Sequence, residues 1–417
     1  MDLFNILAIL ITLTALFSYI NYQYIGLPVT IGVMLIALSL SLALNALGAL
    51  GLGLEKKAEI LLRSIDFDKT LLQGLLSFLL FAGALHININ DLLKRKWIIG
   101  SLSTVGTLLS IFLVGTLTWL VLEWFKVDMS YVYCLLFGAL ISPTDPISVL
   151  GILKSAGAPK NLEIQIAGES LFNDGIGVVA FFIILEIITG GKPVHASYIG
   201  RIFVQEAIGG GLFGLGIGYA AYRMLKSVEN YQVELLITLA LVTGGYALAN
   251  LLHLSGPIAI VIAGLLIGNH GRLLAMSEET RHHLDIFWEL VDEILNAVLF
   301  VLIGLEVLVL TFTQQYLLAS LLIIPVLLFA RFIAVGIQVT LLRPFREFST
   351  GAIRIMTWGG LRGGISVALA LSLPLGPERE VILAVTYVVV VFSILVQGLT
   401  VGKFVKWATL RQKASDI

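Results

Sequence analysis

The sequence is poor in charged residues and in cysteine. Only 13% of its 417 residues are charged and 58% are hydrophobic, so the chain cannot cover a water-soluble surface with polar groups. Its single cysteine, Cys134, lies in an apolar run without a partner for a disulfide within the chain, and we expect it to be inert packing. The net charge of -1 gives no reason to expect nucleic acid as a partner. These deficits exclude a soluble protein and predict one embedded in a bilayer.

Catalytic signatures are missing as well. The chain has no Gly-x-Ser-x-Gly, no His-Glu-x-x-His and no phosphate-cradling glycine loop, so neither intramembrane hydrolysis nor ATP-driven pumping has support. We therefore expect no enzymatic activity and no cofactor.

Apolar runs long enough to cross about 30 Å of hydrocarbon fill almost the whole chain. They predict an all-α polytopic membrane protein, a single transmembrane domain over residues 1–417 without a soluble regulatory domain. About thirteen spans are expected, at residues 3–22, 26–48, 70–87, 97–123, 130–153, 164–189, 200–222, 232–252, 256–270, 284–310, 315–341, 350–373 and 380–405.

The basic residues indicate the orientation, because Lys and Arg concentrate on the cytoplasmic side of membrane proteins. An odd number of spans places the two termini on opposite sides. With the carboxyl terminus inside, most of the 26 basic residues fall in inner loops and the tail, among them Lys94, Arg95, Lys96, Arg223, Lys226, Arg343, Arg346, Lys403, Lys406, Arg411 and Lys413. Half of those outside fall in one loop, as Lys56, Lys57, Arg63 and Lys69. We predict an outside amino terminus and a cytoplasmic carboxyl terminus.

The fifth span, at about 130–153, carries two prolines around Thr144 and Asp145. Each proline lacks an amide donor and frees the carbonyl four residues earlier, here those of Ala139 and Ser142, and the residue before a proline disfavours helix. We predict a break at Thr144–Asp145. Broken helices in transporters commonly direct backbone groups at the carried ion. A simple proline kink is the alternative, which the carboxylate inside the break disfavours.

The sixth span, at about 164–189, holds the densest polar cluster. Glu169 and Asn173, and likewise Ser170 and Asp174, are spaced i and i+4, so two polar rows share one sector of the helix. Burial disfavours the charged form of a carboxylate, while a nearby amide and hydroxyls favour it, so that Asp174 can hold either a proton or a cation. Competition of the two for one carboxylate couples their movements, and we predict an ion antiporter with Asp174 as the carrier. The alternative for Asp174 is a buried ion pair with an arginine.

The twelfth span, at about 350–373, contains Trp358-Gly-Gly-Leu-Arg-Gly-Gly364, whose four glycines disfavour helix by roughly 1 kcal/mol each. We predict a second break here. Arg362 neutralises a helix end or pairs with a carboxylate of the sixth span, and we favour pairing with Glu169 over direct work on the ion. For the buried Arg331 we favour structural pairing, with modulation of the site as the alternative.

Other ionisable residues are weaker candidates. Asp292, Glu293 and Glu306 in the tenth span either line a cation funnel or lie at a solvated helix end. His282 and His283 either sense pH or are solvated. We expect Glu186, Glu206 and Glu234 to be interfacial.

Three motifs together resemble those of a known family. Ser142-Pro-Thr-Asp-Pro146, Gly168-Glu-Ser-Leu-Phe-Asn-Asp-Gly175 and Gly359-Gly-Leu-Arg-Gly-Gly364 are similar to those of NhaP-type sodium/proton antiporters of the monovalent cation:proton antiporter family, in the family's order. The similarity extends over essentially the whole chain. It implies an NhaA-like fold of thirteen helices with inverted repeats and two broken crossing helices, a homodimer, and a place in the prokaryotic inner membrane.

The resemblance also implies roles for individual residues. Asp174 would bind the cation, a monovalent Na⁺ or Li⁺, and the proton; Asp145, Ser170 and the backbone of Thr144 would help to coordinate the cation. Asn173 would be a structural, polarity-setting neighbour, and Glu169 would pair with Arg362. In the family an Asn-Asp pair goes with electroneutral exchange of one proton for one cation, which Asn173 predicts here. The chain departs from many relatives at Ala82, where they carry a glutamate.

Three alternatives remain open at this stage. A potassium/proton antiporter of the same fold is the nearest, because the residues fix the charge of the site and not its size. A cation channel needs a continuous pore, which a single-carboxylate site between broken helices disfavours. A membrane scaffold without transport would leave the cost of so many buried polar groups unexplained.

Overall fold

The computed structural model describes residues 3–49, 74–145, 147–190, 196–310, 313–346, 348–349 and 351–415. Helix makes up 85% of the structure, and the described ranges contain no strand. The predicted loop residues Lys56, Lys57, Arg63 and Lys69, and Pro146 of the fifth span, lie outside the described residues. In chain order the α-helices are α1 (Leu3–Ile20), α2 (Val29–Ala49), α4 (Leu76–Leu85), α5 (Ile89–Lys94), α6 (Lys96–Ser101), α7 (Thr107–Trp124), α8 (Tyr131–Ile141), α9 (Ile147–Ala156), α10 (Lys160–Gly190), α11 (Ala196–Leu225), α12 (Tyr231–Leu251), α13 (Gly256–Leu266), α14 (Arg272–Leu274), α15 (Glu278–Glu306), α16 (Gln314–Leu342), α17 (Ala352–Trp358), α18 (Gly364–Leu371), α19 (Pro377–Phe392) and α20 (Gly398–Ser415).

Short π-helical segments extend or join several of these helices. Leu102–Gly106 joins α6 to α7, and Ser393–Gln397 joins α19 to α20. Asn21–Ile25 extends α1, and Ile267–Gly271 follows α13. The extra residue per turn shifts the helix register without ending the helix, so each joined run still crosses the apolar region as one element.

The long helices have the length and composition of membrane spans. Within the described residues, eight helical runs qualify: Phe4–Ile25, Val29–Gly48, Lys96–Trp124, Lys160–Gly190, Gly200–Leu225, Tyr231–Leu251, Gln314–Leu342 and Pro377–Trp407. Shorter apolar helices lie at Leu76–Leu85, Tyr131–Ile141 and Gly256–Gly271. Outward side chains of these runs are apolar and exposed, for example Leu212 (64%) and Leu321 (59%). The chain is an integral membrane protein, because water does not favour such a surface.

Capping side chains fix where several helices begin. Asn230 accepts hydrogen bonds from the backbone N–H groups of Gln232 (3.0 Å) and Val233 (3.3 Å) at the start of α12. Ser277 and Thr313 do the same for the first turns of α15 and α16. Each cap satisfies amide donors that a helix leaves unpaired at its first turn.

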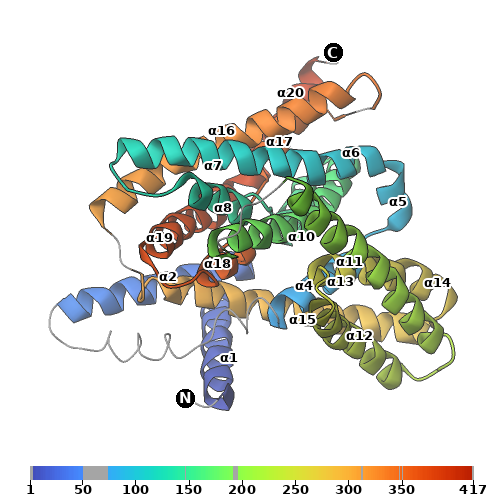
Figure 1. The fold of residues 1–417 in the computed structure, drawn as a ribbon. Coiled ribbons are helices and arrows are strands. Elements are labelled where there is room, and N and C mark those ends of the chain that lie inside the picture. The colour runs from blue at the N-terminus through green and yellow to red at the C-terminus, as the bar shows by residue number, and fades with distance from the viewer. Residues whose placement is uncertain are drawn as a thin grey trace.

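Two helices end in the middle of the apolar region, at the places where the sequence predicts breaks. In the fifth predicted span α8 ends at Ile141 and α9 begins at Ile147. In the twelfth, α17 ends at Trp358 and α18 begins at Gly364. Figure 1 shows α8, α18 and α10 together in the middle of the molecule, with α7 and α16 along one side and α11, α12 and α13 along another.

Small residues bring α10 close to its neighbours. A Cβ atom on Gly168 would lie 2.7 Å from Ile99 Cδ1, and one on Gly175 would lie 2.6 Å from Ile258 Cγ1. Both separations are shorter than a carbon–carbon contact allows, so a larger residue at either position would require the facing isoleucine side chain to move. The polar cluster of α10 is therefore enclosed by helices on several sides.

Candidate functional site

The four polar residues that the sequence singles out on α10 are all buried. Glu169 and Ser170 are each 1% exposed, Asn173 is 0% exposed and Asp174 is 4% exposed. Their i and i+4 spacing places them on adjoining rows of one face. A polar face this deep in a membrane protein requires partners from other helices.

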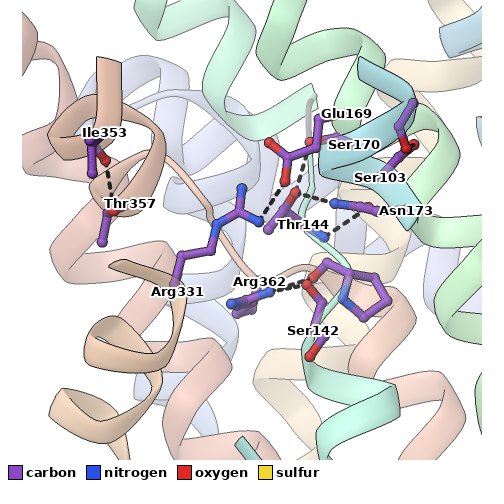
Figure 2. A network of polar contacts seen from close by, with 12 residues as sticks. Ser103, Ser142, Thr144, Glu169, Ser170, Asn173, Arg331, Ile353, Thr357 and Arg362 are labelled. Carbon is purple, nitrogen blue, oxygen red and sulfur yellow. Dashed lines mark hydrogen bonds and ion pairs between the residues drawn. The ribbon is translucent and has the colours of Figure 1, made fainter. Parts of the chain in front are cut away.

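The first break supplies some of those partners. Thr144 lies between α8 and α9, and its backbone N–H donates to Asn173 Oδ1 at 3.2 Å. Asn173 Nδ2 donates in return to Thr144 Oγ1 at 2.9 Å, and the hydroxyls of Thr144 and Ser170 lie 2.8 Å apart. Figure 2 shows these residues linked in one network. Asn173 and Ser170 thus hold the unwound segment against α10, and satisfy a backbone donor that the break leaves without a helical partner.

The second break lies against the first and is bonded to it directly. The backbone N–H of Asp145 donates to the carbonyl of Leu361 at 2.8 Å. The Arg362 guanidinium donates to the carbonyls of Ser142 and of Pro143, the latter at 3.0 Å. The backbone N–H of Arg362 donates to Ser393 Oγ at 2.8 Å. The sequence predicts that a proline leaves the Ser142 carbonyl without a helical donor. Here the guanidinium of Arg362 donates to that carbonyl.

The predicted ion pair between Glu169 and Arg362 is wrong. Glu169 Oε1 instead accepts from Arg331 Nη1 at 2.5 Å, with the two side chains 1% and 6% exposed. Figure 2 shows Arg331 pointing toward Glu169 while Arg362 points toward Ser142. The physical reason is that the carbonyls of the first break compete with Glu169 for the guanidinium of Arg362 and bind it. Helix α16 places Arg331 beside the Glu169 carboxylate instead. Arg331 therefore pairs with Glu169, a partner that the sequence does not reveal. This is the kind of structural pairing that we favour for Arg331.

Asp174 faces a small cavity at the crossing. The cavity holds about 50 Å³ and is lined by Asp174, Asp145 and Thr144, with Asn296 of α15 and Ser366 of α18 also in its wall. Within the described part of the chain, Asp174 makes no hydrogen bond and no ion pair, so the alternative of a structural pair with an arginine is not observed there. A space of this size can hold a small ion or water beside the carboxylate.

Ser170 and Glu169 do not line this cavity. Ser170 lies behind Thr144, whose hydroxyl it contacts, and Glu169 lies beside Arg331. Of the residues predicted to form the cation site, the structure therefore brings Asp174, Asp145 and Thr144 to one cavity. Ser170 contacts Thr144 and does not reach the cavity.

Like Ser366, Asn296 is a polar cavity residue that the sequence does not single out. It is 4% exposed and donates through Nδ2 to the backbone carbonyl of Asp292 at 2.9 Å and to Asp292 Oδ1 at 3.1 Å. Asp292, a funnel candidate from the sequence, thus lies one turn from the cavity. The available signal is weak, because Asn296 is a single amide at the start of a long apolar run.

The remaining candidates lie away from the cavity. Glu306 and Glu234 are buried, at 4% and 1% exposed, so the solvated helix end given as an alternative for Glu306 is wrong. Glu234 lies in the first turn of α12, and the interfacial position expected for it stays a prediction. The ring of His283 stacks on Tyr231 with centroids 4.3 Å apart. Cys134 is a buried free thiol. Ala82 is 1% exposed in a packed apolar cluster, and its neighbour Gly83 is the one that lines the cavity.

The fold and the site define a class of protein. A membrane protein that is helical throughout its described residues, with two interrupted helices bonded to each other beside a buried carboxylate, has the architecture of a secondary ion transporter. The chain belongs to the sodium/hydrogen exchanger family, because the family's transmembrane model matches residues 10–407. This confirms the family predicted from the three motifs.

Individual relatives agree with this assignment. The chain is 53% identical over 407 residues to the Na(+)/H(+) antiporter NhaP of Pseudomonas aeruginosa, with 96% of both chains covered. It is 35% identical over 360 residues to the Na(+)/H(+) antiporter NhaH of Halobacillus aidingensis, covering 85% of this chain and 86% of the relative. The fold is similar to that of the sodium proton antiporter MjNhaP1 from Methanocaldococcus jannaschii, with a TM-score of 0.78, 19% identity and coverage of 98% and 99%.

Proposed function

We propose that this protein is a secondary antiporter that exchanges Na⁺ for H⁺ across the membrane. Membership of the sodium/hydrogen exchanger family supports the two substrates, as do relatives named as Na(+)/H(+) antiporters. The observation that carries the proposal is Asp174, a buried carboxylate without an ion pair that faces a cavity at the crossing of two broken helices. Li⁺ is proposed as a second substrate because it has the same charge and is also a hard cation.

Exchange follows from competition at Asp174. A carboxylate at membrane depth is stable when it binds a proton or a cation, and unstable when it is charged and empty. A site that crosses only when occupied must bring one substrate in for each that it releases. The cation displaces the proton on one side of the membrane, and the proton displaces the cation on the other.

The residues around Asp174 divide into ligands and supports. We assign cation coordination to Asp174, Asp145 and the backbone of Thr144, which share the cavity wall. Ser170 contributes to coordination through Thr144, whose hydroxyl lies 2.8 Å from its own. Asn173 sets the polarity of the site and holds Thr144 in place.

The stoichiometry that we propose is one proton for one cation, without net charge movement. Asn173 is neutral whether or not a proton is bound at the site, so the pair Asn173–Asp174 offers one titrating group. The resemblance to relatives with an Asn-Asp pair supports the same stoichiometry.

In its membrane we propose about thirteen spans related by inverted repeats, an outside amino terminus and a cytoplasmic carboxyl terminus, as a homodimer in a prokaryotic inner membrane. Support for the orientation comes from four basic residues of three loops that are predicted to be cytoplasmic. Lys94, Arg95, Lys160 and Arg346 line one hollow of about 390 Å³, as loops on a single side of the membrane would. The spans, the repeats and the dimer rest on the resemblance.

The test is exchange in proteoliposomes. Purified protein is reconstituted with an imposed pH gradient, and the internal pH is followed after Na⁺, Li⁺ or K⁺ is added. Na⁺ and Li⁺ should dissipate the gradient in the parent protein, and Asp174→Asn should abolish the response. The matched control is Asp128→Asn, which removes an exposed carboxylate outside the site and should exchange like the parent.

Two outcomes would overturn parts of the proposal. Continued exchange by Asp174→Asn would rule out Asp174 as the carrier, and a response to K⁺ in place of Na⁺ would make the protein a potassium/proton antiporter. A membrane potential set by valinomycin and K⁺ should leave the rate unchanged. A strong dependence on that potential would contradict the one-to-one stoichiometry.

A further inference from the structure

Part of the wall of the cavity beside Asp174 is formed by residues that are not among the proposed cation ligands. Asp145, Thr144 and Asp174 all come from the first break and α10. Helix α4 contributes to the wall only the apolar side chains of Leu76, Leu79 and Leu80 and the bare backbone of Gly83. Such side chains cannot replace water around a cation. Asn296 of α15 and Ser366 of α18 are the other polar residues in the wall.

The orientation of the Asn296 amide is determined by chemistry. Both atoms that Asn296 Nδ2 contacts, the backbone carbonyl oxygen of Asp292 at 2.9 Å and Asp292 Oδ1 at 3.1 Å, are acceptors. An amide oxygen turned toward them would face two oxygens and no donor, so the nitrogen must occupy that position. Oδ1 is therefore directed away from Asp292, and it accepts no hydrogen bond from any described residue.

The charge of the cavity favours a cation near this oxygen. Two carboxylates line the cavity and no basic side chain does, so a bound cation is the species that offsets their repulsion. Monovalent hard cations are coordinated by carboxylate, carbonyl and hydroxyl oxygens. The Asn296 side chain is buried in the wall of that cavity, and its amide oxygen has no donor among the described residues, so it is a ligand of the required type.

We infer that Asn296 Oδ1 is a ligand of the transported cation, and that Asp292 is a positioning residue that turns this oxygen into the cavity. The inference rests on the proposed function and extends its site to α15. The bound cation then bridges α15 to the crossing helices. The protonated site holds no cation and therefore lacks this cation-mediated link between α15 and the broken helices.

This assignment predicts a selective effect on the cation. Asn296→Ala should raise the KM for Na⁺ and for Li⁺ by about tenfold, which is the loss of about 1.4 kcal/mol of binding. The maximal rate of exchange at saturating cation should be largely retained. A merely structural residue would instead lower the maximal rate through loss of active protein and leave KM unchanged.

Asp292 should act only through Asn296. Asp292→Leu removes the side-chain acceptor but leaves the backbone carbonyl, so KM for Na⁺ should rise by less than in Asn296→Ala. The double variant should be no worse than Asn296→Ala alone, because the second change removes support for an oxygen that is already absent. Additive effects of the two substitutions would overturn the positioning role.

The matched control is Asn21→Ala. Asn21 is an equally buried asparagine, 2% exposed, which bonds to Leu27 in a part of the chain away from the cavity. Its truncation should reduce the yield or melting temperature of the protein and leave the KM for Na⁺ at the parent value. An equal rise in KM for both asparagine variants would show a general packing effect and overturn the inference.

A binding readout covers a variant that fails to transport. In detergent, Na⁺ should raise the melting temperature of the parent, because a ligand that binds the folded state stabilises it. Asn296→Leu keeps the side-chain volume and removes the oxygen, so its melting temperature should respond to Na⁺ only at about tenfold higher concentration. Asp174→Asn should lose the response.

The outcomes separate the inference from the proposed function. If the parent exchanges Na⁺, Asp174→Asn is inactive and Asn296→Ala keeps the parent KM and Na⁺ response, the proposed function stands and Asn296 is not a ligand. If the parent shows neither Na⁺/H⁺ exchange nor Na⁺-dependent melting, the proposed function fails and the inference falls with it.

Discussion

The break between α8 and α9 and the break between α17 and α18 interrupt two helices in the same core by different means. The first is made by proline and contains a carboxylate, Asp145. The second is made by glycine and contains a guanidinium, Arg362. Proline leaves the Ser142 carbonyl without a helical donor, and Arg362 donates to it and to the carbonyl of Pro143. Each break satisfies groups that the other leaves unpaired, so the bonding between the two breaks stabilises irregular backbone at membrane depth.

The two breaks also differ in what they leave for an ion. Asp145 is half-buried at the cavity, whereas the charged end of Arg362 is occupied by carbonyls. In the proposed mechanism the second break is therefore the support and the first is the liganding segment. Substituting the supporting residues one at a time separates these roles. The expected losses of stability decrease from the ion pair outside the breaks to a single hydroxyl.

The largest effect on stability is expected at the ion pair between Arg331 and Glu169 of α10, which lies outside the two breaks. Arg331→Met leaves Glu169, 1% exposed, without its partner, and should lower the free energy of unfolding by about 3–5 kcal/mol. The measurement is unfolding by SDS in mixed micelles, followed by tryptophan fluorescence. Replacing both residues, as Glu169→Gln with Arg331→Met, should recover most of this loss because no charge is stranded. A double variant as unstable as the single one would show that Arg331 stabilises the core through other contacts.

Arg362 comes next. Arg362→Met removes the donors to the Ser142 and Pro143 carbonyls and should cost roughly 2–4 kcal/mol of stability together with all exchange activity. Arg362→Lys keeps a charge but not the planar fork, so it should be intermediate in melting temperature and in rate. If the lysine variant matched the parent in both, charge alone would explain the role of Arg362, and the bonding between the breaks would be incidental.

Gly363 tests how closely the breaks must approach. A Cβ atom there would lie 2.8 Å from Asp145 Cβ, so Gly363→Ala should displace the carboxylate, at a cost of about 1–3 kcal/mol in stability. The cation affinity in the liposome assay should fall because Asp145 lines the cavity.

The matched control for Gly363→Ala is the same substitution at Gly336 of α16. An added Cβ there meets nothing within 4 Å, and alanine should stabilise the helix by up to about 1 kcal/mol without changing exchange. Equal behaviour of the two variants would contradict the close approach of the breaks.

What the sequence predicts well is local. Prolines and glycines act on their own backbone, so the helix ends at Ile141 and Ile147, and at Trp358 and Gly364, fall on either side of the predicted breaks. The polar rows on α10 follow from spacing alone. In the same way, the composition predicts the membrane class without reference to tertiary structure.

What the sequence does not predict depends on tertiary geometry. Two buried arginines and one carboxylate allow two pairings, and only the positions of α16 and the first break select Arg331 for Glu169. Asn296 is missed for a related reason, since one amide in an apolar run has no periodicity and gains meaning only from the cavity that it lines. The π-helical segments, such as Leu102–Gly106, are likewise absent from the prediction.

The smallest effect is expected at Ser393, whose hydroxyl oxygen accepts the backbone N–H of Arg362 at 2.8 Å. This bond fixes the backbone of the second break independently of the Arg362 side chain. Ser393→Ala leaves one buried donor without a partner and should cost about 1–2 kcal/mol, seen as a lower melting temperature with exchange retained. Ser393→Thr keeps the hydroxyl and should restore the parent value. A loss of exchange in Ser393→Ala as complete as that in Arg362→Met would show that the backbone position of the second break, and not its guanidinium, holds the liganding segment in place.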